Sequence, residues 1–322
     1  MIQLPLVLFI VMAELSIGAF AVLFVLDWRS EVKRSFLVTY GLIYIVLTGL
    51  TYLFQQNFST PDLLNTFPQL DKAWTGYLSL PLLLFFLLML PYNLFLWLDK
   101  KAGVGGKKEG SGGSIVRVLR LLSGGLTTLA GLATLFVLGM IYRPIAPNNL
   151  LGVFTVATFF AAALALGGVM TAMWLGHWYL VTPALSEKPL LFATTLVLVG
   201  VLLQVIFALS SGTTTTYAQP DKSTAPAISA TATAGAQPTT PTSKLQVKPA
   251  TDVPTVAPLG ADVMGWLRVL IAFVMPLVLG GLAWVLVRGR SFQSATGMLY
   301  LVVVCAIAGE AIARGLFLMG LS

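Results

Sequence analysis

Three ionisable side chains stand inside long apolar stretches of the sequence. Glu14 interrupts the first apolar stretch, and Glu310 and Arg314 interrupt the last one. An ionisable group near the centre of a bilayer costs at least about 2.5–3.5 kcal/mol on insertion scales, so such groups face the protein interior and usually have a partner. Because Glu310 and Arg314 are four residues apart, they share one face of a helix in the favourable order. The three residues are therefore the first candidates for a polar site.

Together these side chains could hold a proton that is able to leave. If Glu14 joins the other two, two carboxylates share one guanidinium, and one carboxyl group is expected to keep its proton. Quinol oxidation and quinone reduction both need such a group. A structural ion pair, with Arg314 reaching toward the membrane interface, explains the same residues. We predict that Glu310→Gln lowers quinol-linked turnover of an assembled complex, whereas unchanged turnover would leave only the structural role.

His177 is the fourth candidate and lies near the end of the fifth apolar stretch. Its neighbours Trp174, Trp178 and Tyr179 are typical of the aromatic belt at a membrane interface. His177 is either an ordinary interfacial group, a hydrogen-bond donor to a quinone carbonyl, or a haem ligand paired with another chain. Gly176 leaves room for a ring or a neighbouring helix. If His177 binds a ligand, we expect His177→Ala to weaken that binding.

The chain has few residues that could bind a redox cofactor. It has one histidine and one cysteine, Cys305, which excludes an internal disulfide, a cysteine-ligated iron–sulfur cluster and a haem held by two histidines of this chain. We predict no catalytic residue, no metal ligand and no cofactor within the chain. Electrons in any redox role must then reside on a partner or on a diffusible molecule.

The elements that position these residues are eight apolar stretches, each long enough to cross about 30 Å of hydrocarbon. Of the 322 residues 57% are hydrophobic and only 10% charged, whereas a soluble domain carries about 25% charged residues. The stretches are continuously apolar rather than alternating, which indicates helices and not barrel strands. The sequence therefore predicts an all-α integral membrane protein in a lipid bilayer. The expected spans are Ile2–Leu26, Phe36–Phe54, Tyr77–Leu98, Ile115–Tyr142, Leu150–Val181, Pro189–Leu209, Val263–Val287 and Ala295–Leu318.

The orientation follows from the Lys and Arg residues of the short loops. Twelve of them fall on one side, and three, Lys72, Arg143 and Arg268, fall on the other. Since positive loops stay in the cytoplasm, we expect a multi-pass protein of the cytoplasmic (inner) membrane with both termini outside. The first stretch is expected to be a permanent span and not a cleaved signal peptide. The net charge of +7 is spread over these loops, so no nucleic-acid partner is expected.

The chain divides into four segments. Residues 1–142 form a first four-helix half, 143–209 hold the fifth and sixth spans, 210–260 form a linker, and 261–322 hold the last two spans. The linker is rich in Thr, Ser, Ala and Pro and is expected to be disordered and outside, as a surface insertion or a tether for a partner. A shift of 150 residues aligns Phe9 with Phe159 and Trp28 with Trp178, which hints at two tandem four-helix bundles.

Two motifs carry a resemblance to a known family. The last stretch, "GEAIARGLFLM", resembles the C-terminal helix of the dimethyl-sulfoxide-reductase membrane-anchor family, through Glu310, Arg314, Leu316 and Phe317. The first, "AELSIGAFAVL", is similar to the opening helix of that family. The family belongs with the polysulfide- and nitrite-reductase-type quinol anchors. The resemblance implies a cofactor-free subunit that binds menaquinol or ubiquinol, while an iron–sulfur subunit and a catalytic subunit carry the electrons onward.

Two functions of different classes remain open from the sequence. The first is a quinone-interacting membrane anchor of a respiratory oxidoreductase, with Glu14, Glu310, Arg314 and His177 as candidates for the quinone and proton sites. The second is a transporter or an assembly scaffold, in which the buried charges bind substrate or hold helices together. Copurification of an iron–sulfur or cytochrome partner favours the first, and a solitary protein favours the second.

Overall fold

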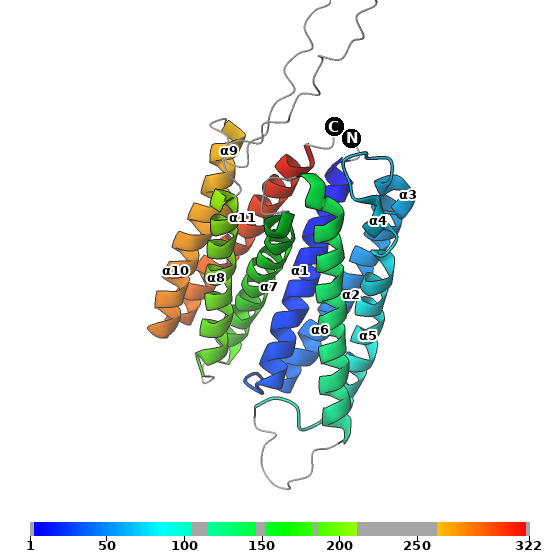
Figure 1. Ribbon diagram of the computed structural model, residues 1–322. Helices are drawn as coiled ribbons and strands as arrows, with labels where there is room; N and C mark the ends of the chain where they lie inside the picture. Colours follow the sequence, from blue (N-terminus) through cyan, green and yellow to red (C-terminus); the bar gives the residue numbers. More distant parts are fainter. Residues whose placement is uncertain (1–2, 105–114, 146–151, 183–185, 211–262, 320–322) are drawn as a thin grey trace, which may run out of the picture.

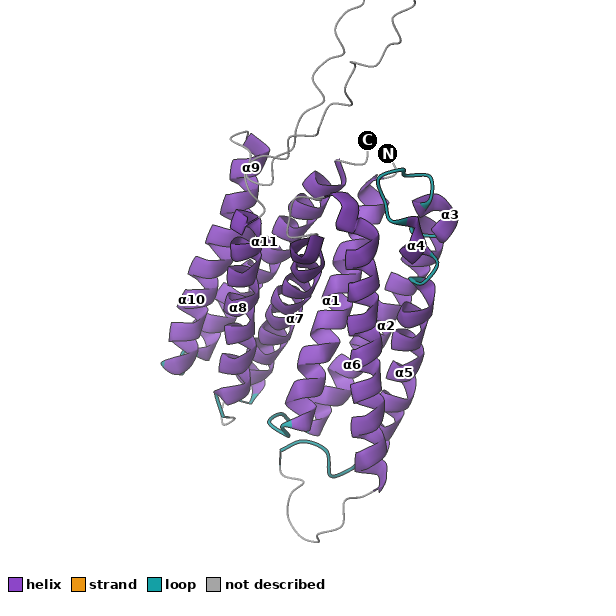
Figure 2. Ribbon diagram, in the orientation of Figure 1, coloured by secondary structure: helices purple, strands orange, loops and turns teal. Residues whose placement is uncertain are grey.

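The computed structural model describes residues 3–104, 115–145, 152–182, 186–210 and 263–319 (Figure 1). Within these ranges it has eight helices that are long and apolar enough to cross a membrane. Figure 2 shows helices joined by loops, with no strand in the described part. The prediction of an all-α, multi-pass membrane protein is confirmed. The predicted disordered linker, residues 210–260, lies outside the described residues except for Ser210, which ends the sixth span.

The first four spans are α1, α2, α5 and α6, and two short helices, α3 and α4, lie between the second and third. Their bounds are Gln3–Trp28, Arg34–Phe58, Ser79–Leu98 and Ile115–Tyr142, with α3 at Pro61–Leu64 and α4 at Lys72–Thr75. The second four spans are α7 (Val153–Val181), α8 (Lys188–Ser210), a composite seventh span and α11 (Phe292–Leu318). The seventh span joins α9 (Val263–Arg268), the π-helix η3 (Val269–Val274) and α10 (Met275–Arg288). These spans lie where the apolar stretches predicted them.

The spans form two four-helix units. In the first unit α1 packs on α2, α2 on α5, α5 on α6, and α6 returns to α1. In the second unit α7 packs on α8, α8 on α10, α10 on α11, and α11 returns to α7. The contacts thus have the arrangement of two tandem bundles. The main junction between the units is α1 against α7, and both chain ends lie at the same end of the bundle (Figure 1).

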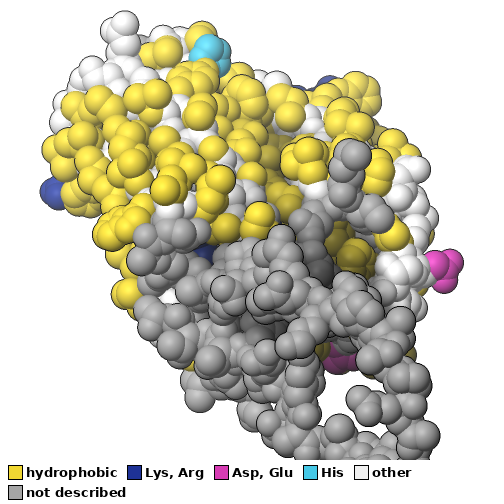
Figure 3. Space-filling view, turned by 90° about the horizontal axis from the view of Figure 1, so that it is seen from above, with side chains coloured by type: hydrophobic (Ala, Val, Ile, Leu, Met, Phe, Trp, Pro, Cys, Tyr) yellow, Lys and Arg dark blue, Asp and Glu magenta, His cyan; other side chains and the backbone are white. Residues whose placement is uncertain are grey.

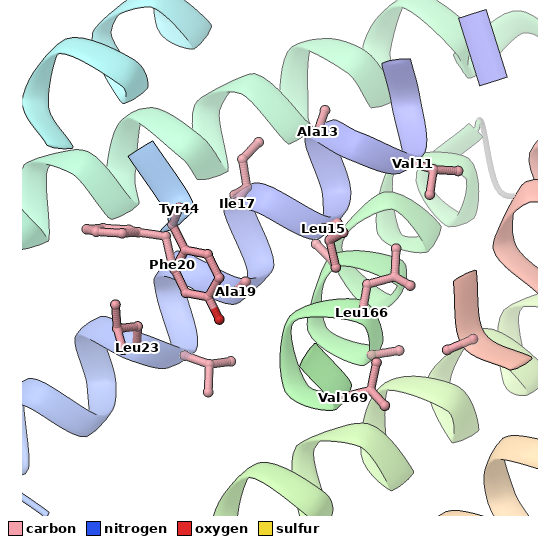
Figure 4. Close-up of a cluster of buried hydrophobic side chains, with 14 of the residues drawn as sticks. Val11, Ala13, Leu15, Ile17, Ala19, Phe20, Leu23, Tyr44, Leu166 and Val169 are labelled. Carbon is pink, nitrogen blue, oxygen red and sulfur yellow. The ribbon is translucent and has the colours of Figure 1, made fainter. Parts of the chain in front are cut away.

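The junction of α1 and α7 depends on residues without side chains. A Cβ added to Gly18 would overlap the backbone of Ala163, and one added to Gly167 would overlap the backbone of Gly18. The two helix backbones therefore touch, as small residues allow in a membrane, where apolar surface alone does not drive helices together. Beside this contact, Leu15 of α1 and Leu166 of α7 face each other (Figure 4). The junction is a tight seam between the two units.

The outer surface of the bundle is apolar, as a lipid-facing surface requires. Large hydrophobic side chains such as Leu42, Leu53 and Val304 are more than half exposed. Seen from the end that carries the termini, hydrophobic side chains cover most of the described surface, and charged ones appear at its margins (Figure 3). A monomeric soluble protein rarely exposes so much contiguous apolar surface to water.

The seventh span departs from a regular α-helix where the sequence places a proline. Pro276 has no backbone N–H and cannot continue the hydrogen-bond ladder, so a kink is predicted there. The structure has six residues of π-helix, Val269–Val274, which end two residues before Pro276. This turn packs on α11, because a Cβ on Gly309 would lie 2.5 Å from Cα of Ala272. A π-helical turn therefore lies against the stretch of α11 that carries Glu310.

Candidate functional site

Glu14, Glu310 and Arg314 converge in the interior of the bundle. Arg314 donates a hydrogen bond through Nη2 to Glu14 Oε1, and its Nε lies 2.8 Å from Glu310 Oε1. The three residues are buried, with at most 6% of any one exposed. We call them the upper ion cluster, since they lie between mid-depth and the end of the bundle that carries the termini. The structure therefore brings together three of the four residues that the sequence singled out.

Residues from α6, α7 and α8 complete the surroundings of this cluster. Gln204 of α8 donates a hydrogen bond from Nε2 to Glu310 Oε2 at 2.8 Å. The guanidinium carbon of Arg314 lies 4.0 Å from the ring centre of Phe159, a favourable cation–π contact, and Tyr142 stacks on the same ring at 6.0 Å. Sequence reasoning did not identify these partners. Gln204 could have been noticed as a lone amide inside an apolar span.

The charges of the upper ion cluster do not balance when all three groups are ionised. Two carboxylates then contact one guanidinium, and the guanidinium of Arg268, at the end of α9, adds a positive charge that interacts with Glu310 and Arg314 from a longer distance. Oε2 of Glu14 is buried and has no hydrogen-bond partner among the described residues. A buried carboxylate oxygen without a hydrogen-bond partner is costly, and a proton on Glu14 would remove that cost. The arrangement can therefore hold one proton and release it when a proton acceptor arrives.

The space beside the cluster is small. A cavity of about 10 Å³ lies between Gln204, Glu310 and Ala272. This volume is close to the minimum that one water molecule needs. A quinone ring would require these side chains to move apart, because the site is closed in this conformation.

A second buried ion cluster lies near the opposite end of the first unit. Arg120 of α6 reaches Asp27 of α1 at 3.4 Å and Asp99, which follows α5, at 3.3 Å. The hydroxyl of Tyr92 donates a hydrogen bond to Asp27 Oδ2 at 3.1 Å. All four residues are at most 6% exposed. This lower ion cluster again combines two carboxylates with one guanidinium.

The lower ion cluster was missed by the sequence analysis, which treated Arg120 as one of the loop charges that set topology. Asp27 and Asp99 do lie at helix ends, as expected, but the bundle covers them. The physical reason is that both carboxylates face Arg120 inside the unit, so a position at a helix end is not necessarily a solvated one. Arg120 is therefore a second buried guanidinium, besides that of Arg314.

His177 lies apart from the upper ion cluster in depth, toward the end of the bundle near which the lower ion cluster lies. It is four residues from the end of α7 that is opposite the upper ion cluster, and its side chain is exposed. The chain has one histidine, and Figure 3 shows it at the edge of the view. Gly176 does admit a close neighbour: a Cβ there would lie 2.8 Å from Thr296 Oγ1 of α11. A ligand role for His177 stays a prediction, separate from the upper ion cluster.

The aromatic residues beside His177 do more than form an interfacial belt, because they also pack against other helices. Trp174 lies 5.0 Å from Tyr40 and Trp178 lies 5.7 Å from Phe36, between ring centres. Tyr179 is buried. These contacts hold α7 against α2 and leave His177 pointing outward.

One ion pair outside the membrane spans joins two loops of the second unit. Arg290, between α10 and α11, lies 2.6 Å from Glu187, which precedes α8. A backbone hydrogen bond and then the hydrogen bond from Arg290 hold the pKa of Glu187 below its usual value. The pair is solvent-exposed, so its contribution to stability is small.

Among the described residues, no group of three or more His, Cys, Asp and Glu side chains is placed to hold a metal ion. A scan against protein-family models matches none, and a search of curated proteins finds no matching sequence.

Proposed function

We propose that this protein is the quinol-interacting membrane subunit of a respiratory oxidoreductase, and that its upper ion cluster handles the protons of the quinol. The observation that supports this most strongly is the convergence of Glu14, Glu310 and Arg314 in a buried site where two carboxylates contact one guanidinium. The additional carboxyl group supplies the exchangeable proton position.

Each residue has a distinct part in this function. Oxidation of a quinol to a quinone releases two electrons and two protons. Glu310 accepts the proton of one quinol hydroxyl, Glu14 accepts the proton of the other, and both protons then leave to water. Arg314 keeps both carboxyl groups in place, and Gln204 orients Glu310 through its 2.8 Å hydrogen bond. The electrons leave to an iron–sulfur subunit and then to a catalytic subunit, because this chain has no redox ligand set of its own.

The proposed setting is the cytoplasmic membrane, with menaquinone or ubiquinone as the exchangeable ligand and both termini outside. The end of the bundle opposite the termini carries described Lys and Arg residues such as Lys33, Lys100 and Lys188. Under the positive-inside rule this end faces the cytoplasm. The upper ion cluster then lies in the outer part of the membrane.

The second candidate function is a membrane scaffold or a transporter. The lower ion cluster favours it, because the same combination of groups recurs where it joins α1, α5 and α6 within one unit. If both clusters only fasten helices, quinone binding is not needed to explain either. The two candidates differ in whether the upper ion cluster responds to a ligand.

The test measures binding of a fluorescent quinol-site inhibitor of the hydroxyquinoline N-oxide class. The protein is purified with any subunits that remain bound and is placed in lipid nanodiscs. We expect the parent protein to quench the fluorescence saturably, and Glu310→Gln to weaken binding by about tenfold, which corresponds to about 1.4 kcal/mol. Asp99→Asn makes the same kind of change in the lower ion cluster and should leave binding unchanged. Absence of saturable binding to the parent protein would overturn the proposal.

A further inference from the structure

A groove runs along the junction of the two four-helix units. Its walls are α1 and α6 on one side and α7 and α8 on the other, and its volume is about 560 Å³. Gly18 and Ala163, where α1 and α7 touch, are among its lining residues, so the groove begins where that tight contact ends. Phe160, Phe192 and Phe207 also line it, and each is partly exposed. We call this apolar groove, which opens onto the lipid-facing surface, the seam groove.

Two basic side chains stand at the end of the seam groove opposite the chain termini, one on each wall. Arg29 follows α1, four residues after the lining residue Val25, and its backbone N–H donates to the Val25 carbonyl at 3.0 Å, so it continues the same helix face. The guanidinium carbon of Arg29 lies 4.8 Å from the ring centre of Phe192 on α8, another lining residue. Lys188, the exposed first residue of α8, stands one turn before Phe192 on the same face. The apolar groove therefore ends at two positive charges.

The cations at this end are able to bind an anion, although carboxylates stand near them. Nε and Nη2 of Arg29 both contact Glu31 Oε1, at 2.8 and 2.7 Å, and no other side-chain hydrogen bond of Arg29 occurs among the described residues. A guanidinium has five N–H donors, so the others remain available. The side chain of Arg29 is 45% exposed and that of Glu31 only 19%, which makes the cation the more accessible member of the pair. Glu187, beside Lys188, is likewise paired with Arg290. Lys188 therefore adds positive charge in excess of these two pairs.

We propose that the seam groove holds an acyl chain of an anionic phospholipid whose phosphate is bound by Arg29 and Lys188. The choice of occupant rests on charge, because an apolar lining accepts any hydrocarbon chain. A phospholipid joins such a chain to a phosphate at the depth of the membrane interface, and charge-assisted hydrogen bonds from a guanidinium to phosphate are strong. Basic pockets between membrane helices on the cytoplasmic side bind anionic head groups in this way.

The bound phospholipid fills the space that the contact of α1 and α7 leaves open between the two units. One of its chains touches all four helices of the junction, and its phosphate links Arg29 of the first unit to Lys188 of the second. It therefore stabilises the packing of the units against each other. Neither a quinone nor the upper ion cluster takes part in this binding, so the site exists whether or not the proposed function is correct.

The experiment compares dioleoyl phosphatidylglycerol with dioleoyl phosphatidylcholine, which have the same chains and differ in the net charge of the head group. The full chain is purified with any subunits that remain bound, and is delipidated in mild detergent. Each lipid is then added at increasing concentration. Native mass spectrometry counts the lipid molecules bound per protein, and the melting temperature is measured at the same concentrations.

Two variants change different parts of the site, and each has a matched control. Arg29→Gln removes a charge at the end of the groove. Its control is Arg288→Gln, because Arg288 is also exposed at this end and lies 4.9 Å from a ring, that of Trp284, which is not among the lining residues. Ala21→Leu fills the groove at a lining residue. Its control is Ala133→Leu, because Ala133 is exposed on α6 and does not line the groove.

We expect the parent protein and both controls to bind one phosphatidylglycerol at least about fivefold more tightly than phosphatidylcholine. Arg29→Gln should lose about fivefold in affinity for phosphatidylglycerol, which corresponds to about 1 kcal/mol for one basic residue at a membrane surface. Its affinity for phosphatidylcholine should change little. Ala21→Leu should weaken the binding of both lipids, because the larger side chain occupies the place of the acyl chain. Phosphatidylglycerol should raise the melting temperature of the parent protein more than that of Arg29→Gln.

Three results would overturn the proposal. The first is equal affinity of the parent protein for the two lipids. The second is an equal loss of phosphatidylglycerol in Arg29→Gln and Arg288→Gln, since basic charge anywhere at this end would then suffice. The third is a quinone that stays bound in place of the phospholipid and is lost in Ala21→Leu. If Ala21→Leu does not fold, the comparison of Arg29→Gln with Arg288→Gln decides the matter, because both change exposed side chains.

Discussion

Arg314 in the last span and Glu14 in the first are joined by a hydrogen-bonded ion pair although 300 positions separate them in the chain. Glu14 belongs to the first four-helix unit and Arg314 to the second. The pair therefore fastens the two units to each other just above the glycine-rich contact of α1 and α7. A polar site built at this boundary can respond to small relative movements of the units.

Removal of the guanidinium of the upper ion cluster should destabilise the protein strongly. Arg314→Met leaves two buried carboxyl groups without their cation, a situation that costs about 3–5 kcal/mol when a buried pair is broken. We expect a lower melting temperature in detergent, measured by tryptophan fluorescence. The triple variant Glu14→Gln, Glu310→Gln, Arg314→Met should recover most of the loss, since the three charges of the upper ion cluster are removed together. If the triple variant is as unstable as Arg314→Met, charge imbalance is not the cause.

Removal of the guanidinium of the lower ion cluster should lower the stability of the protein without changing quinone binding. Arg120→Met is expected to cost about 3–5 kcal/mol, because Asp27 and Asp99 then remain buried and unpaired. The variant Asp27→Asn, Asp99→Asn, Arg120→Met should restore the melting temperature. Its affinity for the fluorescent inhibitor should equal that of the parent protein. A loss of affinity would show that the two clusters are coupled through α1.

The addition of a single methyl group at the contact of α1 and α7 should destabilise the packing of the two units against each other. In Gly167→Ala the new Cβ meets the backbone of Gly18, which cannot move without shifting α1. Overpacking of this kind costs about 1–3 kcal/mol, and we expect the melting temperature to fall accordingly. Gly281→Ala is the control, since a Cβ there meets nothing within 4 Å. Equal melting temperatures of the two variants would contradict the tight seam.

The orientation proposed for the bundle can be tested by labelling single cysteines in intact cells. In a Cys305→Ser background, Thr66→Cys lies at the end of the bundle near the termini and Lys100→Cys at the opposite end, and both positions are exposed. A membrane-impermeant maleimide should label Thr66→Cys directly and Lys100→Cys only after the membrane is permeabilised. The reverse pattern would place both termini in the cytoplasm.

Several features could be predicted from local sequence because they depend on the solvent alone. A span must be apolar for about twenty residues whatever its neighbours are, so the eight spans were correctly located. Glu14, Glu310 and Arg314 could be singled out because lipid penalises them wherever they point. The proline pattern was less informative, because Pro276 stands just after a π-helical turn whereas Pro91 lies inside the continuous helix α5.

Other features depended on partners far away in the chain. The burial of Asp27, Asp99 and Arg120 comes from how α1, α5 and α6 pack at their ends, and each residue by itself looked like an ordinary helix-end charge. Gln204 can reach Glu310 only because of the packing within the second unit, where α8 lies against the seventh span and α7 lies against α11. The position of His177 on an exposed face was also decided by packing, since a helix near the interface can be rotated either way.

The sequence by itself determined which segments enter the bilayer and which of their residues are too costly to leave facing lipid, because transfer free energy is a property of each residue. Only the tertiary structure decided that α1 and α7 meet through glycine, that Arg314 finds Glu14, and that a long groove opens at the seam. Those outcomes depend on which helix faces fit one another closely, and in a membrane that fit comes from shape and polar partners and not from hydrophobicity.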